Sequence, residues 1–277
     1  MRHVQVRCQV SERRACRVLG FSRSTARYAS KLKDDEVALT QALEALRLSH
    51  PQWGYRKLTA LLREQGWKVN PKRIYRIWRE QGWQKSAPVS RKRKASGQST
   101  NACHVRKATQ GNQAWAVDFV QDHTRDGKPF RILTVIDEYT REVLALEAKR
   151  SMKQDEVEEV LSRLVQSRGA PAFVRSDNGG EFSGQQIQTA LTRLGTQTAL
   201  IAPGSPWQNG KNERLNGILS QELLSKEVWA SVLEAHVMCQ QWMQTYNELR
   251  PHGSLKMKTP SSFAQEAKQQ GCWYHPH

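Results

Sequence analysis

Alternating apolar and polar side chains mark the second half of the chain as the start of a sheet. From Trp115 to Val120 every second residue is large and apolar, so Asp118 points away from the face that carries Trp115. Residues 131–137 are almost continuously apolar, as in a central strand covered on both faces. Residues 142–147 predict a third strand, and an Asp-Gly turn signal between the first two predicts an antiparallel meander.

Helical and strand patterns alternate after this meander. We expect a helix, a strand, a helix and a strand over residues 153–167, 172–177, 181–194 and 197–202. With the last helix, the order βββαβαβα predicts an α/β fold with a mixed five-stranded sheet and flanking helices.

That last helix, from Pro206 onward, has two different sides. Leu215, Ile218, Leu219 and Leu223 form one apolar stripe. The polar residues Glu213, Asn209, Asn216 and Ser220 fall on roughly the opposite side. Glu213 is therefore not a core residue, and its amide neighbours could position a substrate or a metal-bound water.

The first 83 residues show only helical patterns. Ser11 can cap a helix that runs to Arg17, Gly20 breaks it, and Ser22 restarts another, which is a helix-turn-helix outline. A longer helix is predicted from Asp34 or Asp35 to His50, with an apolar stripe made by Val37, Leu39, Leu43 and Leu46.

A second helix pair follows, over residues 55–66 and 72–82. Asn70-Pro71 is a good start for the second helix, because Asn caps and Pro suits the first helical position. Ile74, Ile77 and Trp78 share one face of this helix, and the cations Lys72, Arg73, Arg76 and Arg79 lie largely off it. This pattern predicts a recognition helix for the DNA major groove, although an ordinary amphipathic helix with a solvated basic face has the same pattern.

Charge is distributed unevenly along the 277 residues, whose net charge is +17. Residues 1–110 hold 25 Lys and Arg against 7 Asp and Glu, whereas residues 111–277 hold 18 against 19. A basic front half joined to a near-neutral back half indicates a module that binds a polyanion, with nucleic acid the leading partner. A merely solvated basic surface is the alternative.

The cysteine content and the hydropathy of the chain indicate its cellular compartment. The five cysteines are an odd number without a CxxC pair, which favours a reducing compartment over a disulfide framework. The first residues lack the apolar run of a signal peptide, and no stretch is long enough for a membrane span. We expect a soluble cytoplasmic protein.

Three carboxylates carry the candidate chemistry: Asp118, Asp177 and Glu213, with 58 residues between the first pair and 35 between the second. Converging carboxylates repel one another unless cations lie between them, and oxygen ligands suit Mg²⁺. Each acid also has an ordinary interpretation, as a strand carboxylate, a turn residue or a surface residue of a helix. Asp137 and Glu138, which follow the second predicted strand, show that a strand-end carboxylate is not rare here.

The residues around these acids resemble a known family. The motifs are Trp115-x-x-Asp, Arg175-Ser-Asp-Asn-Gly-Gly-Glu-Phe, Ser205-Pro-Trp-Gln-Asn-Gly-x-x-Glu-x-x-Asn-Gly, Tyr246-Asn-Glu-Leu-Arg-Pro-His-x-Ser-Leu and Gln52-Trp-Gly-Tyr-Arg-Lys-Leu. Over residues 10–264 the chain is similar to bacterial insertion-element transposases of the OrfB type, whose catalytic (DDE) domain is akin to retroviral integrases.

This resemblance implies a ribonuclease-H-like core in which Asp118, Asp177 and Glu213 are catalytic and bind Mg²⁺ or Mn²⁺, as two ions. It implies a DNA transposase that cleaves strands and transfers a 3′-OH end, so that an insertion element moves. The implied partners are double-stranded DNA, both element ends and target, a homo-multimer, and a protein from an upstream frame. In a bacterial cell such a protein would be associated with the nucleoid.

Several other residues are expected to contact DNA: Asn178, Asn209, Lys211, Arg214, Asn216, Lys72, Arg73 and Arg76. Ser220 stands where the family often carries Lys or Arg, and Lys211 and Arg214 project from the helix in other directions than Glu213. No zinc-binding His/His/Cys/Cys module like that of retroviral integrases is found. A plain nuclease and a non-catalytic DNA-binding protein, such as a decayed element copy, remain alternatives.

The expected division of the chain follows the changes in pattern. It runs as a helix-turn-helix-like segment (1–33), a helical DNA-binding domain (34–83), a basic linker (84–112), the ribonuclease-H-like catalytic core (113–226), and a C-terminal helix and tail (227–277). The linker has almost no apolar side chains and cannot form a core of its own.

Overall fold

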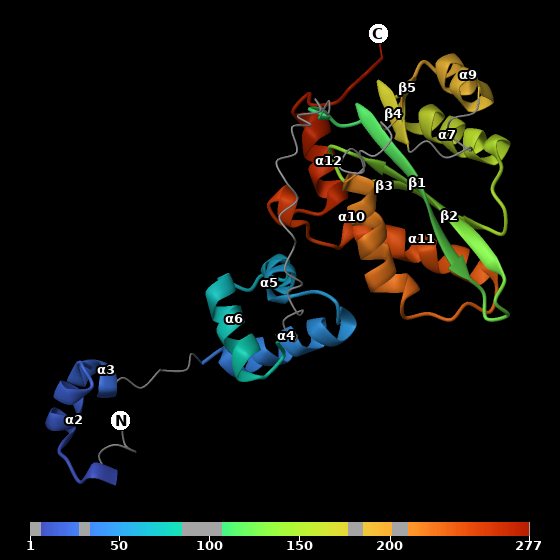
Figure 1. Cartoon of the computed structure of the whole chain (residues 1–277). Coiled ribbons are helices and arrows are strands. Elements are labelled where there is room, and N and C mark those ends of the chain that lie inside the picture. Colours follow the sequence, from blue (N-terminus) through green and yellow to red (C-terminus); the bar gives the residue numbers. More distant parts are fainter. Residues whose placement is uncertain (1–6, 28–33, 85–106, 177–184, 201–209, 277) are drawn as a thin grey trace, which may run out of the picture. The chain divides into compact units, whose positions relative to one another are not determined.

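The protein is described here by a computed structural model (Figure 1) that covers residues 7–27, 34–84, 107–176, 185–200 and 210–276. The chain divides into two compact units, residues 1–49 and residues 50–277, and each is described by itself. Within the described ranges, no helix is both long and apolar enough to cross a membrane.

The first unit contains the short helices α2 (Glu12–Val18) and α3 (Arg23–Arg27). Ser11 caps α2 by accepting a hydrogen bond from the amide of Arg14 at 3.3 Å, as expected. Gly20 adopts a φ of 67°, which turns the chain between the two helices. The Glu12 carboxylate accepts from Arg23 and Arg27, so α2 and α3 are joined by ion pairs.

Helix α4 (Glu36–Ser49) completes the first unit. Leu39 and Leu43 are fully buried, as the apolar stripe predicts. Val37 is 71% exposed, so its assignment to the stripe was wrong. A helix turns by about 100° per residue, which places Val37 roughly opposite Leu39.

The second unit begins with α5 (Tyr55–Glu64) and α6 (Pro71–Glu80). The Asn70 side chain caps α6 by accepting from the amide of Arg73 at 2.8 Å. Ile74, Ile77 and Trp78 are buried on one side of α6, which confirms the predicted apolar face.

A mixed five-stranded sheet forms the centre of the second unit. Its strands are β1 (Ala114–His123), β2 (Pro129–Asp137), β3 (Val143–Lys149), β4 (Phe173–Ser176) and β5 (Gln197–Leu200). They lie in the order β3-β2-β1-β4-β5. The first three pair antiparallel, while β4 pairs parallel with β1 and β5 parallel with β4. The predicted fold class is confirmed.

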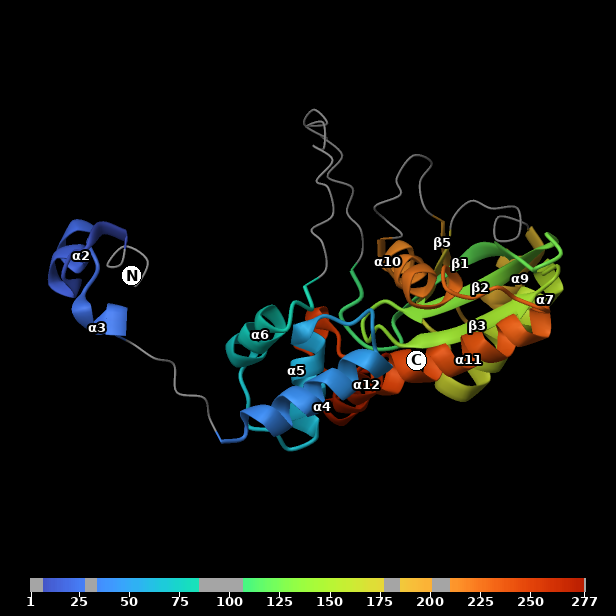
Figure 2. The ribbon, with the colours of Figure 1, turned by 90° about the horizontal axis from the view of Figure 1, so that it is seen from below.

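Helices cover both faces of this sheet (Figures 1 and 2). Helices α7 (Gln154–Arg168) and α9 (Gln185–Arg193) pack on the face that carries Trp115 and Val117. Helices α10 (Gly210–Leu219) and α11 (Val232–Glu248) pack on the face that carries Ala116. Because side chains alternate along a strand, Asp118 belongs to the face covered by α10 and α11.

The chain after α10 is more structured than expected. A π-helical turn (Ser220–Leu224) extends α10, and a 3-10 turn (Gly253–Leu255) follows α11. A further helix, α12 (Pro260–Gln269), lies where only a tail was expected, so residues 227–277 contain two α-helices rather than one.

The C-terminal segment pairs with the residue that leads into β1. The amide of Gly111 donates to the carbonyl of Cys272 at 2.9 Å, and the amide of Tyr274 donates to the carbonyl of Gly111 at 2.8 Å. A Cβ atom at Gly111 would lie 2.5 Å from the Trp273 ring, so this close approach requires glycine.

Candidate functional site

Asp118 lies on β1 and is half-buried beneath α10. Its Oδ1 accepts a hydrogen bond from the amide of Phe119 at 2.8 Å, and its Oδ2 accepts from Asn216 Nδ2 at 2.9 Å. Asn216 is on α10, so this bond joins the helix directly to the strand. The Asn216 amide nitrogen must face the carboxylate, because its oxygen would be repelled there.

Glu213 lies on α10 one turn before Asn216. It is exposed, and it sits in the first turn of the helix, where the helix dipole favours a carboxylate. At 100° per residue, positions 213 and 216 are about 60° apart around the helix axis. The side of α10 that reaches Asp118 is therefore also the side that carries Glu213.

Asp177, Asn178 and Asn209 lie outside the described residues. The strand that precedes Asp177 is described: β4 ends at Ser176. This strand is the parallel neighbour of β1, with Arg175 paired to Ala116.

Asn212 is a further polar residue of this region that sequence reasoning missed. It is fully buried, and within the described structure neither its Oδ1 nor its Nδ2 has a hydrogen-bond partner. The Oδ1 of Asn216 is also buried and without a partner. Leaving such an atom buried and unbonded costs about 1–3 kcal/mol. The i, i+4 spacing of the two asparagines could have indicated that they share one side of α10.

The two other strand-end carboxylates have structural roles. Asp137 is fully buried and accepts hydrogen bonds from the amides of Asn112, Tyr139 and Thr140 at 2.7–3.1 Å. Glu138 pairs with Arg175 at 2.8 Å. Burial raises the pKa of both carboxyls. They support the loop after β2 and the neighbouring strand β4.

The oxygen atoms of the described polar side chains in this region suit a hard divalent ion as ligands. Asp118 and Glu213 offer carboxylate oxygens, the ligands that Mg²⁺ prefers, and the unpartnered amide oxygens of Asn212 and Asn216 lie on the same helix. Within the described ranges, no three His, Cys, Asp or Glu side chains form a metal-binding group. The third predicted ligand, Asp177, is outside those ranges.

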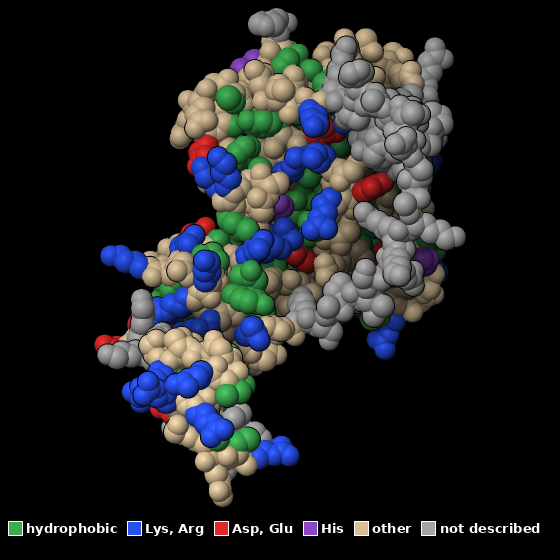
Figure 3. Space-filling view, turned by 60° about the vertical axis from the view of Figure 1, so that its left-hand side comes forward, with side chains coloured by type: hydrophobic (Ala, Val, Ile, Leu, Met, Phe, Trp, Pro, Cys, Tyr) green, Lys and Arg blue, Asp and Glu red, His purple; other side chains and the backbone are tan. Residues whose placement is uncertain are grey.

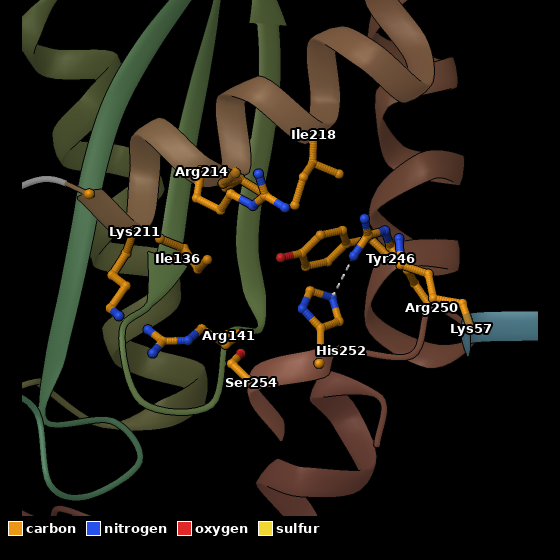
Figure 4. A pocket seen from close by; sticks show the side chains of 13 residues that line it. Lys57, Ile136, Arg141, Lys211, Arg214, Ile218, Tyr246, Arg250, His252 and Ser254 are labelled. Carbon is orange, nitrogen blue, oxygen red and sulfur yellow. Dashed lines mark hydrogen bonds between the residues drawn. The ribbon is translucent and has the colours of Figure 1, made fainter. Parts of the chain in front are cut away.

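Lys211 and Arg214 line a pocket beside α10 (Figure 4), and Asp118 is not among the residues that line it. The pocket has a volume of about 370 Å³, and Glu213 is not among its lining residues. Ser220, which stands where a cation was sought, is exposed in the π-helical turn.

Helix α6 presents the other predicted DNA contacts. Lys72 is exposed and Arg73 and Arg76 are half-buried. A shallow hollow is lined by Lys72, Tyr75, Arg76, Arg79 and Glu80. Arg76 pairs with Glu80 at 3.2 Å, so its charge is partly compensated. Figure 3 shows one face of the molecule, on which Lys and Arg side chains clearly outnumber Asp and Glu.

Two domain families match the chain. The integrase core domain matches residues 108–206 and, in a second form, residues 194–260. The HTH-like domain matches residues 33–94. The first covers the sheet and its helices, and the second covers α4, α5 and α6.

Similar proteins come from bacterial insertion elements. The chain is 34% identical to the insertion element IS407 uncharacterized 31.7 kDa protein of Burkholderia multivorans, over 95% of this chain and 94% of that protein. It is 33% identical to the insertion element IS476 uncharacterized 39.2 kDa protein of Xanthomonas euvesicatoria, over 94% of this chain and 74% of that protein. It is also 26% identical to the transposase InsD for insertion element IS2D of Escherichia coli, over 82% of this chain and 79% of that protein.

A solved structure shares the fold. The simian T-cell lymphotropic virus intasome in complex with the PP2A regulatory subunit B56 gamma contains a chain that matches with a TM-score of 0.52 and 21% identity. The match covers 80% of this chain and 74% of that one.

Proposed function

Because this chain belongs to the insertion-element transposase family and has an integrase core, we propose that it cleaves DNA strands and transfers their 3′-OH ends. Asp118, Asp177 and Glu213 are the proposed catalytic residues. The observation that carries the proposal is the bond from Asn216 to Asp118, which brings the Glu213 side of α10 to β1.

We propose that the three acids hold two Mg²⁺ or Mn²⁺ ions. Bound ions would lower the pKa of a nucleophile and stabilise the negative charge on the leaving oxygen. Residues of the chain would orient the acids and exclude water. Asn216 fixes one carboxylate oxygen of Asp118, and the apolar residues beneath α10 keep water from the buried side of the site.

The proposed reaction occurs in two steps. In the first, a water oxygen attacks a backbone phosphorus, the P–O3′ bond breaks, and the strand leaves with a 3′-OH. In the second, that 3′-OH attacks a phosphorus of another strand, a new phosphodiester forms, and a 3′-oxygen of that strand leaves. The protein forms no covalent bond to DNA in either step.

The proposed substrate is double-stranded DNA, as element ends and as target. Helix α6 would contact it through Lys72, Arg73 and Arg76, and the catalytic region through Asn178, Asn209, Lys211, Arg214 and Asn216. We propose that the chain acts as a homo-multimer on paired ends, with a protein from an upstream frame. The division at residues 1–33, 34–83, 84–112, 113–226 and 227–277 is kept as the proposed domain arrangement.

A strand-transfer experiment tests this function. A labelled duplex that carries the DNA flanking the gene is incubated with target plasmid and Mg²⁺, and joined products are separated on a gel. We expect the wild type to join ends and Glu213→Gln to lose joining while it still binds the duplex. Glu227→Gln, at an exposed glutamate beyond the π-helical turn, is the matched control and should retain joining.

The other outcomes decide between the alternatives. Cleavage without joining would identify a plain nuclease, and binding without cleavage would identify a non-catalytic DNA-binding protein. Joining by Glu213→Gln at the wild-type rate would show that the acids are assigned wrongly.

A further inference from the structure

The pocket beside α10 collects positive charge (Figure 4). We call it the α10 pocket. It holds about 370 Å³, and the described residues that line it include no Asp or Glu. Its basic lining residues come from four separate segments of the second unit: Lys57, Arg141, Lys211 with Arg214, and Arg250 with His252.

One wall of the pocket is formed by Arg141, Lys211 and Arg214. Arg141 lies in the turn after β2 with a φ of 65°, and its guanidinium donates to the backbone carbonyl of Glu138. Lys211 and Arg214 are spaced i, i+3 on α10 and are exposed to solvent. All three line the cavity, and Figure 4 shows the Lys211 side chain directed toward the Arg141 guanidinium. Apart from the contact of Arg141 with Glu138, no hydrogen bond or ion pair occupies these three groups in the described structure.

The opposite wall is formed by Tyr246, Arg250 and His252. The Tyr246 hydroxyl points into the cavity (Figure 4). Arg250 lies 3.4 Å from His252 through Nη1 and Nε2. A guanidinium can only donate, so Nε2 accepts and the proton of neutral His252 is on Nδ1. This wall therefore offers hydrogen-bond donors to a ligand.

The charges of the pocket are only partly compensated. Glu222, next to the pocket, accepts from Arg250 at 2.9–3.1 Å and lies 3.7 Å from Lys57. Burial and then the nearby cations Arg250 and Lys57 lower the pKa of His252 to about 3. Burial and then Arg250 lower the pKa of Lys57 to about 8, despite its contact with Glu222. The cations Arg250 and Lys57 add to the effect of burial, and a cluster of like charges favours a bound anion.

We propose that the α10 pocket binds a backbone phosphate of the DNA strand whose cleavage site lies at Glu213. Its groups are guanidinium, ammonium, hydroxyl and imidazole donors, and phosphate oxygens only accept. Because this inference rests on the proposed function, it names a contact of the same substrate. The pocket and Glu213 lie on different sides of α10, so the bound phosphate would be near the phosphate at the cleavage site but distinct from it.

The double variant Lys211→Gln with Arg214→Gln tests this contact. Both side chains are exposed, and equal thermal unfolding of variant and wild type checks that the fold is retained. The control double variant, Lys153→Gln with Arg193→Gln, removes the same charge from exposed positions at the N-cap of α7 and on α9, beyond the other face of the sheet. Binding of a labelled duplex is measured by fluorescence anisotropy in EDTA over a series of salt concentrations.

The affinity for DNA falls as salt concentration rises. Loss of one phosphate contact makes the plot of log affinity against log salt concentration less steep, by about 0.9 in slope. We expect this decrease in the pocket variant and not in the control variant or in Glu213→Gln. Equal slopes for the pocket and control variants would overturn the proposal.

A second arm identifies the source of the phosphate. Thermal unfolding is followed in inorganic phosphate and in sodium chloride of equal ionic strength. If inorganic phosphate stabilises the wild type but the pocket variant keeps the wild-type slope with DNA, the pocket binds a free anion and the DNA contact is refuted.

The salt series also separates this inference from the proposed function, because it needs no metal and no catalysis. The wild type could fail to join ends while the pocket variant still shows a less steep salt dependence. That result would support the phosphate contact and refute the catalytic function. A wild type without salt-dependent binding would refute both.

Discussion

Asn216 gives the sharpest prediction about the proposed site. Its Nδ2 donates to Asp118 Oδ2 at 2.9 Å and is the described contact between α10 and this carboxylate. A hydrogen bond to a charged group contributes about 1.5–3 kcal/mol. If that energy holds the carboxylate in its working orientation, its loss slows the reaction by about 10- to 150-fold, since 1.36 kcal/mol corresponds to tenfold in rate.

Asn216→Ala removes this bond and leaves the acids in place. We expect the strand-transfer rate to fall by that factor and the Mg²⁺ concentration for half-maximal rate to rise, because Asp118 is no longer fixed. Gln221→Ala removes an exposed amide from the π-helical turn and should change neither quantity. Urea unfolding of both variants shows whether a lower rate reflects a lower stability.

Two results would refute the reasoning. One is an Asn216→Ala variant with the wild-type rate and the wild-type Mg²⁺ dependence. The other is a fall in rate that is fully explained by unfolding, which would make Asn216 a residue of stability alone.

Two further predictions concern the ion pairs and the histidine beside the α10 pocket. Glu222→Gln should lower the free energy of unfolding by about 3–5 kcal/mol, because it leaves the nearly buried Arg250 (7% exposed) without its carboxylate. Glu80→Gln, in a surface pair, should lower it by less than about 0.5 kcal/mol in the same urea experiment, and equal losses would contradict the argument. Folded His252 has a pKa of about 3 against 6.5 for the free side chain, so below pH 6.5 the unfolded chain takes up a proton that the fold excludes. Stability should therefore fall by about 1 kcal/mol between pH 7 and pH 5.5 in the wild type, and an equal fall in His252→Gln would assign it to other groups.

The sequence pattern predicted those features of the fold that depend on residues close together in sequence. The alternation around Asp118 indicated its face of the sheet, the Asn-Pro pair indicated the start of α6, and the apolar stripe of α10 indicated which side is buried. The prediction for Val37 was wrong because this residue is apolar and close in sequence to the stripe, yet it lies on the far side of its helix.

What escaped prediction depends on contacts between distant residues. Asp118 and Asn216 are 98 positions apart, so their hydrogen bond follows only from the fold. The α10 pocket likewise joins Arg141 to residues near 250, and no spacing indicates that these cations share a cavity. Asn212 looked like an ordinary polar helix residue because its burial is set by the sheet beneath it.

The pairing of Gly111 with residues 272–274 brings the two ends of the segment that contains the sheet into contact. A domain whose two ends meet can be inserted between other segments, or circularly permuted, without stretching its fold. We therefore expect that another module could be joined at either end of this segment without displacing the contact between Asp118 and Asn216.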